Sequence, residues 1–476
     1  MRPKVLLCQF DNLEFYSYMI LSAQLVKKGV EHDVEIINND ASFYNKLSSV
    51  YRDFGIIGFY TCNTDFIRIM RLVKDIKKQF NDRVIILGGP HPTINYEEID
   101  FDFVDFICVG DGEFHFSDWV SNLHYRERQN YFNIACDPSK PFKAEFVHDL
   151  NKSPAPNRDI YYGKYPFLRK MGVRRFLLSS GCPFKCTYCY NENFRNKFND
   201  SYSKTVLFKD PENAIGEIEN VLKKYPEEAV SFSDDNFCIN RKWLFSFLSL
   251  YSKRINKPFH AATTITVLTD DVIDKLYESN LKVLRIAMET TNSRIRNEIL
   301  RRPKYTNEQF SEIAAKLRKK KIKVIILNMF CLPTQTLKDC VDMFNFAIDN
   351  KLIMCTTILV PYRGTAMYKY CLENGLLINP SGREGDLNSS WTSLKGIEME
   401  RMVTLQNYTF ILNFFRPMIP VILFLSNFMW FRYLSYKLVA PINVIGMNFF
   451  AWAGLFQFKK IFKLGIKTFR IYKRKE

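Results

Sequence analysis

Three cysteines at close, uneven spacing are the residues of this chain best suited to chemistry. Cys182, Cys186 and Cys189 follow the pattern Cys-x3-Cys-x2-Cys. Three thiolates spaced in this way can each hold one iron of a 4Fe-4S cluster and leave the fourth iron open, so that it can bind a small molecule and pass it an electron. A structural zinc site is the alternative, but zinc would need a fourth Cys or His, and no other lies between His148 and Cys238. The spacing therefore favours a cluster with one open iron.

The cysteines lie in a loop after the first strand of a predicted α/β barrel. Short apolar runs at 174–178, 229–233, 260–265, 283–287, 324–328 and 356–360 alternate with helical patterns such as those at 307–320 and 337–350. Six strand–helix units of this kind predict a partial (β/α)6 barrel. In such barrels the chemistry takes place at the carboxyl ends of the strands.

Charged and polar residues stand at those predicted strand ends. Asp234 and Asp235 close the second strand, and Glu289 ends the fourth. A carboxylate there can bind an ammonium group or ribose hydroxyls, although adjacent carboxylates can equally cap the helix that follows. Weaker candidates at these ends are Arg301, Arg302 and Asn328.

A second parallel sheet is predicted before the barrel. Its five apolar runs lie at 5–8, 34–37, 54–60, 84–87 and 106–109, with helical segments near 15–28, 64–80 and 113–123. This alternation predicts a doubly wound, Rossmann-like sheet that binds ligands beyond the carboxyl ends of its strands. Glycines in the turns at those ends would let a large flat ligand approach the backbone, although any one turn taken alone is also typical of an ordinary strand-to-helix connection. The candidate ligand-binding residues in these turns are Tyr60, Thr61, Gly88, Gly89, His91, Gly110, Gly112 and Glu113.

The cysteine spacing, with the aromatic Tyr188 just before the last cysteine, resembles the signature of the radical S-adenosylmethionine enzymes. In that family the amino and carboxylate groups of S-adenosylmethionine occupy the open iron, and electron transfer breaks an S–C bond to give a deoxyadenosyl radical. The resemblance implies that Asp234 and Asp235 lie where the family holds the amino group of this cosubstrate, and that Glu289 hydrogen-bonds it. It also implies that Tyr188 and Asn328 belong to the same binding site.

The barrel departs from the family at one motif. Residues 328–336 match the family's GLPGET-like run only loosely, because Cys331 and Thr334 stand where the family has glycine. Glycine often marks a left-handed backbone, so the replacements bear directly on the conformation of this turn.

The first sheet resembles the cobalamin-binding domain that precedes the barrel in many of these enzymes. There a GGxHxT-like turn follows the fourth strand and a GEGE-like turn the fifth, and this chain has Gly88-Gly-Pro-His-Pro-Thr93 and Gly110-Asp-Gly-Glu113. The Asp-x-His-x-x-Gly motif, by which other cobalamin proteins supply a histidine to cobalt, is absent, since the first turn reads Phe10-Asp-Asn-Leu-Glu-Phe15. The resemblance therefore implies cobalamin without a histidine ligand from that position.

Composition sets the domain limits and the expected compartment. Of the 476 residues, 47% are apolar, which is enough for several buried cores. A polar, proline-containing segment separates the two α/β series, so we expect a cobalamin-binding domain at 1–125, a linker at 126–170, a radical S-adenosylmethionine domain at 171–375 and a mainly helical region at 376–476. Twelve cysteines without paired spacings, and no signal-peptide pattern at the N-terminus, indicate the reducing cytoplasm.

The last part of the chain is basic and apolar. Residues 401–476 hold twelve Lys or Arg and a single acid, Glu476, so most of the net charge of +17 lies in the tail, which argues against a nucleic-acid groove in the body. Uncharged stretches at 418–431 and 438–458 are interrupted by Pro420 and Pro441, which argues against a membrane-spanning helix. Eight basic residues at 459–475 predict a basic amphipathic helix in peripheral contact with the inner face of a membrane; a helix packed on the barrel is the alternative.

These features predict a cobalamin-dependent radical S-adenosylmethionine enzyme that methylates an unactivated carbon of a hydrophobic small molecule or lipid, with an electron donor such as flavodoxin or ferredoxin. Oxidative cyclisation or rearrangement with the same cofactors is the runner-up. An RNA methylthiotransferase would hold a second cluster in the first domain, for which Cys8, Cys62 and Cys108 are available, but its small basic β-rich RNA-binding domain has no counterpart here. The carboxylates at the strand ends argue against a cluster that only senses oxygen or iron.

Overall fold

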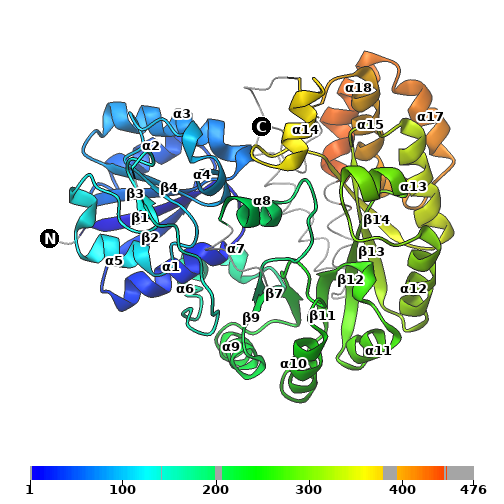
Figure 1. Cartoon of the computed structure of the whole chain (residues 1–476), viewed down its shortest axis with the longest axis horizontal. Coiled ribbons are helices and arrows are strands. Elements are labelled where there is room, and N and C mark those ends of the chain that lie inside the picture. Colours follow the sequence, from blue (N-terminus) through cyan, green and yellow to red (C-terminus); the bar gives the residue numbers. More distant parts are fainter. Residues whose placement is uncertain (1–2, 141, 199–205, 379–393, 444–445, 447–476) are drawn as a thin grey trace. The chain divides into compact units, whose positions relative to one another are not determined.

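The computed structural model describes residues 3–140, 142–198, 206–378, 394–443 and 446 (Figure 1). The described chain divides into two compact units. The first takes in the residues up to Lys170 and the segment Tyr190–Leu207, and the second takes in Met171–Cys189 and the described residues from Phe208 onward. The cysteine loop therefore belongs to the second unit, and the helix directly after it, α8 (Tyr190–Lys197), belongs to the first.

The first unit is built on a six-stranded sheet with the order β2-β1-β3-β4-β5-β6. Its elements are β1 (Lys4–Gln9), α1 (Tyr16–Lys27), β2 (His32–Ile36), α2 (Asp40–Ser48), β3 (Phe54–Tyr60), α3 (Asn63–Gln79), β4 (Val84–Gly88), α4 (Pro90–Ile94), β5 (Phe106–Cys108), α5 (His115–Ser121), β6 (Ile134–Ala135), α6 (Asp159–Tyr162) and α7 (Pro166–Arg169). Strands β1 to β5 pair in parallel, and β6 pairs antiparallel with β5. Figure 1 shows α2 and α3 on one side of this sheet and α1 and α5 on the other. The predicted doubly wound parallel sheet is confirmed.

The central strands of this sheet form from apolar runs that are covered on both faces. Leu6, Ile57 and Ile85 are completely buried in one core cluster together with apolar residues of α2 and α3. Near-continuous apolar sequence is what a parallel strand with helices on both sides requires. Because these strands run parallel, the turns after β1, β3, β4 and β5 lie at one edge of the sheet.

The segment 126–170, which we expect to be a linker, contributes elements to the first unit. Its strand β6 extends the sheet. Tyr161 of α6 is completely buried, and its hydroxyl donates a hydrogen bond to Gln9 Oε1. Lys164 Nζ lies 2.7 Å from Asp33 Oδ2 of β2. The segment thus packs against the start of the sheet, in contacts that its proline-containing composition does not reveal.

The second unit is built on a six-stranded, entirely parallel sheet with the order β14-β13-β12-β11-β10-β7. Its elements up to the last strand are β7 (Val173–Phe176), β8 (Ser179–Ser180), β9 (Leu207–Phe208), α9 (Pro211–Lys224), β10 (Ala229–Phe232), α10 (Arg241–Arg254), β11 (Phe259–Thr263), α11 (Asp270–Glu278), β12 (Leu281–Glu289), α12 (Asn307–Lys319), β13 (Lys323–Phe330), α13 (Leu337–Asp349) and β14 (Ile353–Ile358). Each strand of the large sheet pairs with the next along the chain, and a helix follows β10, β11, β12 and β13. The predicted partial (β/α)6 barrel is confirmed.

Helices from the C-terminal region follow the last strand, and two of them, Ile397–Asn407 and Thr409–Leu412, pack against it. The helices of this region are α14 (Ala366–Glu373), α15 (Ile397–Asn407), α16 (Thr409–Leu412), α17 (Met418–Leu425), α18 (Met429–Leu434) and the π-helical turn Ser435–Val439. The N–H of Met354 in β14 donates to Asn413 Oδ1 at 2.8 Å, and Asn413 Nδ2 donates to Met354 O at 2.9 Å. One side-chain amide thus replaces a neighbouring strand, and an edge strand would otherwise leave these groups unpaired.

Within the described residues no single helix has the length and hydropathy of a membrane span. Helix α17 and the segment Met429–Asn443 reach that length and composition only as a pair, and they are bent by 116° relative to each other. The basic amphipathic helix predicted at 459–475 lies outside the described residues.

Candidate active site

The cysteine loop follows β7 and is anchored at its centre by Thr187. The backbone N–H of Thr187 donates to Leu300 O at 3.1 Å, and its hydroxyl donates to Ile299 O at 2.8 Å. Its carbonyl accepts a hydrogen bond from the N–H of Met367 in α14 at 2.9 Å. Two of these bonds hold the middle of the loop against the turn that follows β12, and the third ties it to α14.

The three cysteines of the loop do not converge on one point. Cys186 is buried, and Cys182 and Cys189 are half-buried. In the described part of the chain no three Cys, His, Asp or Glu side chains surround a single metal-ion position. A 4Fe-4S cluster does not require such a group, because each thiolate binds a different iron. Burial raises the pKa of the Cys186 thiol, and the nearby Arg302 guanidinium opposes that rise, which favours the thiolate that an iron needs.

Beside the loop, Tyr188, Glu289 and Arg302 form a buried polar cluster. The Tyr188 hydroxyl donates to Glu289 Oε1 at 2.8 Å. Arg302 Nη1 lies 3.8 Å from the same carboxylate oxygen and donates to Cys186 Sγ at 3.5 Å. Arg302 Nη2 donates to Ala287 O at 3.0 Å, which ties the guanidinium to β12. Burial raises the pKa of Glu289, and the charge of Arg302 and the bond from Tyr188 act in the opposite direction.

This polar cluster brings together residues that the sequence analysis identified one at a time. Tyr188 and Glu289 are both predicted site residues, whereas Arg302 is only a weak candidate in the sequence. In the structure Arg302 is the group that contacts a predicted cluster ligand. Arg301, the other weak candidate, is exposed. The sequence does not indicate which of these two neighbouring arginines points into the site. The turn that directs Arg302 inward contains an irregular π-helical segment, Ile295–Ile299, which residue spacing does not predict.

Asp234 lies at the carboxyl end of β10 and is almost completely buried. Its Oδ1 accepts hydrogen bonds from the N–H of Leu178 at 3.0 Å and from the Ser179 hydroxyl at 2.5 Å. Burial raises the pKa of Asp234 to about 6, against these bonds. Asp235 is exposed, and its charge contributes to raising the pKa of Cys182, which places it near the cysteine loop. Ser179 is a residue that the sequence analysis missed, because a serine before the loop carries no spacing signal.

Asn328 lies beside Glu289 across the paired strands β12 and β13. It is buried, and its Nδ2 donates only to the Met354 sulfur, at 3.3 Å. Thioether sulfur is a weak acceptor, so this amide is poorly satisfied by the chain itself.

Three buried polar atoms at these strand ends have no hydrogen-bond partner among the described residues. They are Asp234 Oδ2, Asn328 Oδ1 and Arg302 Nε. Buried polar atoms nearly always find a partner, so each marks a position for an atom of a ligand or a water molecule. Two open acceptors and one open donor beside a cysteine loop suit a cosubstrate that carries an ammonium group, hydroxyls and a carboxylate. The residues present therefore fit S-adenosylmethionine.

In the turn after β13, the two residues that replace the family's glycines have the left-handed backbone conformation that glycine favours. Cys331 has φ +59° and Thr334 has φ +63°, so both are left-handed. The Cys331 thiol is buried and donates to Met399 O at 3.5 Å. The Thr334 hydroxyl accepts from Arg294 Nη2 at 2.7 Å. Both positions therefore hold the left-handed conformation that glycine favours, with side chains that make contacts of their own.

In the first unit, Thr93 connects the two glycine-containing turns. Its hydroxyl donates to Gly89 O at 2.8 Å and accepts from the N–H of Gly110 at 3.1 Å. Gly89 has φ +104°, and a Cβ there would lie 2.8 Å from Thr61 O. A Cβ at Gly110 would lie 3.0 Å from Glu145 O. A Cβ at either position would therefore meet a backbone oxygen of the chain itself, and the role of these glycines in letting a flat ligand approach stays a prediction.

The other predicted residues of these turns differ in how much space surrounds them. At Gly88 a Cβ would make only an ordinary contact, 3.6 Å from Cys108 Cβ, whereas at Gly112 it would lie 2.9 Å from Cys108 Sγ. Tyr60 is half-buried and packs on Phe15, with ring centroids 4.6 Å apart. Of the four glycines in these turns, Gly88 is thus the one at which an added Cβ would still have room.

Three predicted side chains point into the protein. Thr61 and His91 are completely buried, and Glu113 is buried and accepts from the Ser153 hydroxyl at 2.6 Å. His91 Nδ1 lies 2.6 Å from Asn63 Oδ1. These contacts are structural ones, and they leave the backbone of the turns as the part that a ligand can reach.

The strand order of the first unit fits a large planar cofactor such as cobalamin. The order 2-1-3-4-5 has its switch point between β1 and β3, where doubly wound sheets bind ligands. The loop after β1 is held there by Gln9, whose Nε2 donates to Leu13 O at 2.7 Å. This loop contains no histidine, in agreement with cobalamin that takes no ligand from that position.

The structure argues against a second cluster on Cys8, Cys62 and Cys108. Cys8 lies in β1 and Cys108 ends β5, and three strand spacings separate these strands in the sheet order. Strands about 4.8 Å apart put them roughly 14 Å from each other, which is too far for two ligands of one 4Fe-4S cluster. The Cys62 thiol donates to Asp65 Oδ2 at 3.2 Å, and a carboxylate next to it disfavours the thiolate.

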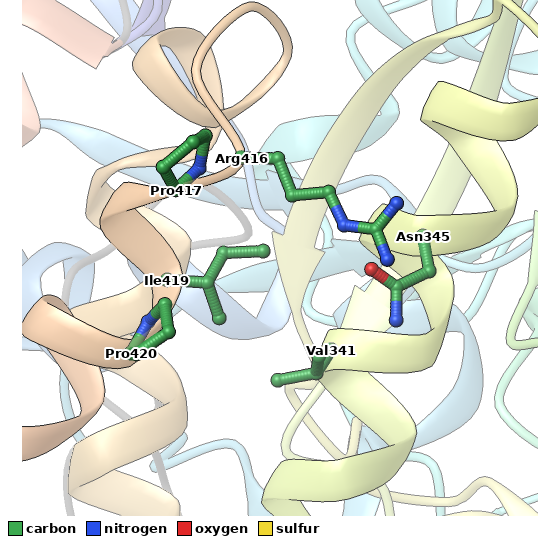
Figure 2. A pocket seen from close by; sticks show the side chains of 6 residues that line it. All are labelled: Val341, Asn345, Arg416, Pro417, Ile419 and Pro420. Carbon is green, nitrogen blue, oxygen red and sulfur yellow. The ribbon is translucent and has the colours of Figure 1, made fainter.

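A pocket of about 370 Å³ lies elsewhere in the second unit, between α13 and the start of α17 (Figure 2). It is lined by Val341, Asn345, Arg416, Pro417, Ile419 and Pro420. None of the candidate site residues lines it. Helices pack on the outside of such a barrel, so this pocket is separate from the site at the strand ends.

Comparisons with known proteins agree with this geometry. The sequence pattern of the radical SAM superfamily matches residues 176–347. An uncharacterized methyltransferase of Pyrococcus horikoshii is 24% identical over 413 residues, which are 82% of this chain and 86% of the relative. The bacteriochlorophyllide d C-8(2)-methyltransferase of Chlorobaculum tepidum is 23% identical over 359 residues, which are 73% of this chain and 74% of the relative.

A solved structure shares the fold. The radical S-adenosylmethionine methyltransferase TsrM from Kitasatospora setae, solved with cobalamin and a 4Fe-4S cluster bound, matches with a TM-score of 0.60 at 13% identity. The match covers 78% of this chain and 75% of that chain. At this identity the likeness concerns the fold.

Proposed function

This chain belongs to the cobalamin-binding radical S-adenosylmethionine enzymes, and we propose that it transfers a methyl group to an unactivated carbon of a hydrophobic small molecule. One observation carries the proposal: the cysteine loop meets the buried Tyr188–Glu289 pair through Arg302 at the carboxyl ends of the barrel strands. Relatives named as methyltransferases support methylation as the outcome.

The cluster would be held by Cys182, Cys186 and Cys189, and S-adenosylmethionine by the open polar atoms beside them. Asp234 Oδ2 is a buried acceptor suited to the ammonium group, and Asn328 Oδ1 is a second acceptor suited to a hydroxyl. When bound, these groups supply radical chemistry at an unactivated C–H bond, and cobalamin supplies a methyl group.

The residues of this chain keep that site ordered and polar. Arg302 places a fixed positive charge against Cys186 and Glu289, which favours the anionic form of both. Tyr188 orients the Glu289 carboxylate by donating to one of its oxygens. Because this cluster is buried, the electrostatic interactions within it are stronger than they would be in water.

Cobalamin would bind at the carboxyl edge of the first sheet, against the turns after β1, β3 and β4. The switch point in the strand order and the room beside Gly88 support this assignment. A flavodoxin or ferredoxin would supply the electron. Oxidative cyclisation with the same cofactors is the second candidate, since the site needs the same cluster and cosubstrate for it.

The test needs no knowledge of the substrate. Protein reconstituted anaerobically with iron, sulfide and hydroxocobalamin should contain one 4Fe-4S cluster and show corrinoid absorption after desalting. The variant with Cys182, Cys186 and Cys189 all replaced by Ala should lose iron and sulfide but keep the corrinoid. Cys136→Ala, at a half-buried cysteine of the other unit, is the matched control and should keep both.

Methylation is separated from cyclisation by the fate of the methyl group. Reduced protein incubated with S-adenosylmethionine that is deuterated in its methyl group should yield deuterated methylcobalamin in the mass spectrum. A cluster and corrinoid without this transfer would support cyclisation. A full cluster in the triple cysteine variant would contradict the assignment of the ligands.

A further inference from the structure

Among the described residues, the C-terminal helices carry most of the exposed large apolar side chains. Eleven of the twenty such residues in the described part of the chain lie within positions 414–442. This apolar surface consists of Phe414, Phe415, Val421, Phe424, Phe428, Met429, Trp430, Tyr433, Leu434, Leu438 and Ile442. Single exposed apolar residues are ordinary, but a concentration of them marks an interaction surface.

The helices that carry this surface also contribute buried side chains to the core of the second unit. Ile419 and Ile422 of α17 are buried in the main core of the second unit. Phe431 of α18 stacks on Tyr408 of the same core, with ring planes 8° apart. Helix α17 nevertheless has no charged residue, so its outward side is apolar as well. A helix that only packs on a core keeps its opposite side polar.

Charge indicates what this surface contacts. From Arg401 to Lys475 the chain contains no acidic residue and twelve basic ones. Lys437 is exposed among the aromatic residues, 6.0 Å from the Tyr433 ring centroid. Trp and Tyr beside Lys and Arg are typical of protein surfaces at the boundary between lipid headgroups and acyl chains. Seventy-five residues without an acid complement an anionic surface.

We propose that the apolar surface docks the enzyme on an anionic phospholipid bilayer. The aromatic and aliphatic side chains enter the headgroup boundary, and the exposed Lys437 among them meets the lipid phosphates. This proposal goes beyond the proposed methyl transfer and does not depend on it. It also gives a hydrophobic substrate a route to the enzyme from the bilayer.

The first experiment measures binding of the full-length chain to vesicles by sedimentation. We expect it to sediment with an equimolar mixture of phosphatidylcholine and phosphatidylglycerol at low salt, and to bind phosphatidylcholine alone about tenfold more weakly. High salt should release it. Binding that is equal on both vesicles and insensitive to salt would overturn docking through charge.

A matched pair of double variants tests the surface itself. Phe424→Glu with Trp430→Glu should weaken binding to the anionic vesicles by about tenfold or more. Val26→Glu with Val50→Glu is the control, because these residues are equally exposed: 65% and 59% for the first pair, and 59% and 67% for the second. All four side chains are solvent-exposed, so both variants should fold, which circular dichroism checks. Equal loss in both variants would overturn the assignment to this surface.

The unaltered side chain of Trp430 gives a measurement that does not rely on those variants. Brominated phosphatidylcholine included in the anionic vesicles should quench the fluorescence of the bound protein, and Trp430→Phe should remove much of that quenching. Full quenching in Trp430→Phe would place another part of the chain in the bilayer and overturn the proposal. A protein that stays in the supernatant with anionic vesicles also overturns it, and light scattering would then assign the surface to a second copy or to residues 447–476.

Discussion

The buried carboxyl of Asp234 makes a prediction about stability that can be worked out from the structure. Its Oδ1 accepts two hydrogen bonds, but its Oδ2 is buried and has no partner among the described residues. Burial therefore raises the pKa of Asp234 from its ordinary value of 3.8 to about 6. We expect Asp234→Asn to make the protein without bound cofactors more stable above pH 6, relative to the unaltered chain.

The direction and the size of this change in stability follow from proton linkage. Between pH 4 and pH 6 the folded state binds more protons at Asp234 than the unfolded state does, so the free energy of unfolding falls as pH rises. The shift of about two pKa units corresponds to roughly 3 kcal/mol at about 1.4 kcal/mol per unit. Asparagine keeps the acceptor oxygen and the shape but has no proton to lose. The difference in unfolding free energy between Asp234→Asn and the unaltered chain should therefore grow by about 2.5 kcal/mol from pH 4 to pH 7.

The assay is urea denaturation at a series of pH values, followed by the fluorescence of Trp243. This residue lies in the core of the second unit, and its Nε1 donates to Lys209 O at 2.6 Å. Asp271→Asn is the control, because hydrogen bonds from Thr269 and Arg241 lower the pKa of that carboxyl and its effect should have the opposite sign. A difference for Asp234→Asn that stays flat across this pH range would refute the reasoning, since the carboxylate would then be satisfied in the folded state.

The same variant should lose function while it gains stability. If the open oxygen of Asp234 accepts a hydrogen bond from the ammonium group of S-adenosylmethionine, Asn can still accept but offers no charge. Charged hydrogen bonds are worth about 1 kcal/mol more than neutral ones, so we expect binding to weaken by about fivefold to tenfold. Equilibrium dialysis with the reconstituted protein measures this. Unchanged affinity would remove Asp234 from the binding site.

Two further predictions concern the same strand ends. Arg302→Gln should lower the reduction potential of the cluster, because the guanidinium that donates to Cys186 Sγ favours the more negative reduced state, and a potentiometric titration followed by electron paramagnetic resonance measures it. An unchanged potential would contradict that contact. Thr334→Gly should raise the free energy of unfolding by about 1 kcal/mol, because it relieves a left-handed backbone at a β-branched residue. In urea denaturation followed at Trp243, a loss of stability would mean that the bond from Arg294 outweighs the strain.

Both sheets could be predicted because their strands are short apolar runs separated by helical patterns. The last strand is the least accurate, since β14 begins at Ile353 and ends at Ile358, whereas the predicted range is 356–360. The apolar residues Leu359 and Val360 continue the hydrophobic run past the end of the strand and pull the prediction toward the C-terminus. The closing of the β14 edge by Asn413 could not be predicted, because it depends on a single amide 59 residues away.

Residues of the site could be predicted where the chemistry requires one residue type. They could not be predicted where their position depends on how the chain packs. The cysteine spacing and Glu289 carry their own chemistry, so the sequence indicates them directly. Arg302 reaches Cys186 across 116 residues, and only the irregular turn after β12 brings the two together. The sequence also marks Gly89 and Gly110, and the structure adds that a Cβ at either position would lie within 3.0 Å of a backbone oxygen of the chain itself.

Left-handed residues at the two ends of the barrel strands have different causes. At the amino ends, Asn256, Asn280, Lys321 and Lys351 each come two residues after the end of α10, α11, α12 or α13. A left-handed residue at this position is a common way to end a helix, and it satisfies carbonyl groups of the last turn. These four conformations are explained by the ends of the helices and imply nothing about function.

At the carboxyl ends, Glu289, Cys331 and Thr334 are left-handed as well, although none of the three follows the end of a helix. A non-glycine residue in this conformation costs about 1 to 3 kcal/mol and persists only where its surroundings hold it. At Thr334 the side chain has no contact with the candidate site, so glycine should relieve the strain. At Glu289 the same backbone ends β12 and presents the carboxylate to Tyr188 and Arg302, and glycine there would remove the carboxylate. The backbone strain at Glu289 therefore accompanies a buried carboxylate placed beside the cysteine loop, and we expect that strain to persist. The strain at Thr334 positions no group of the candidate site, so we expect it to be dispensable.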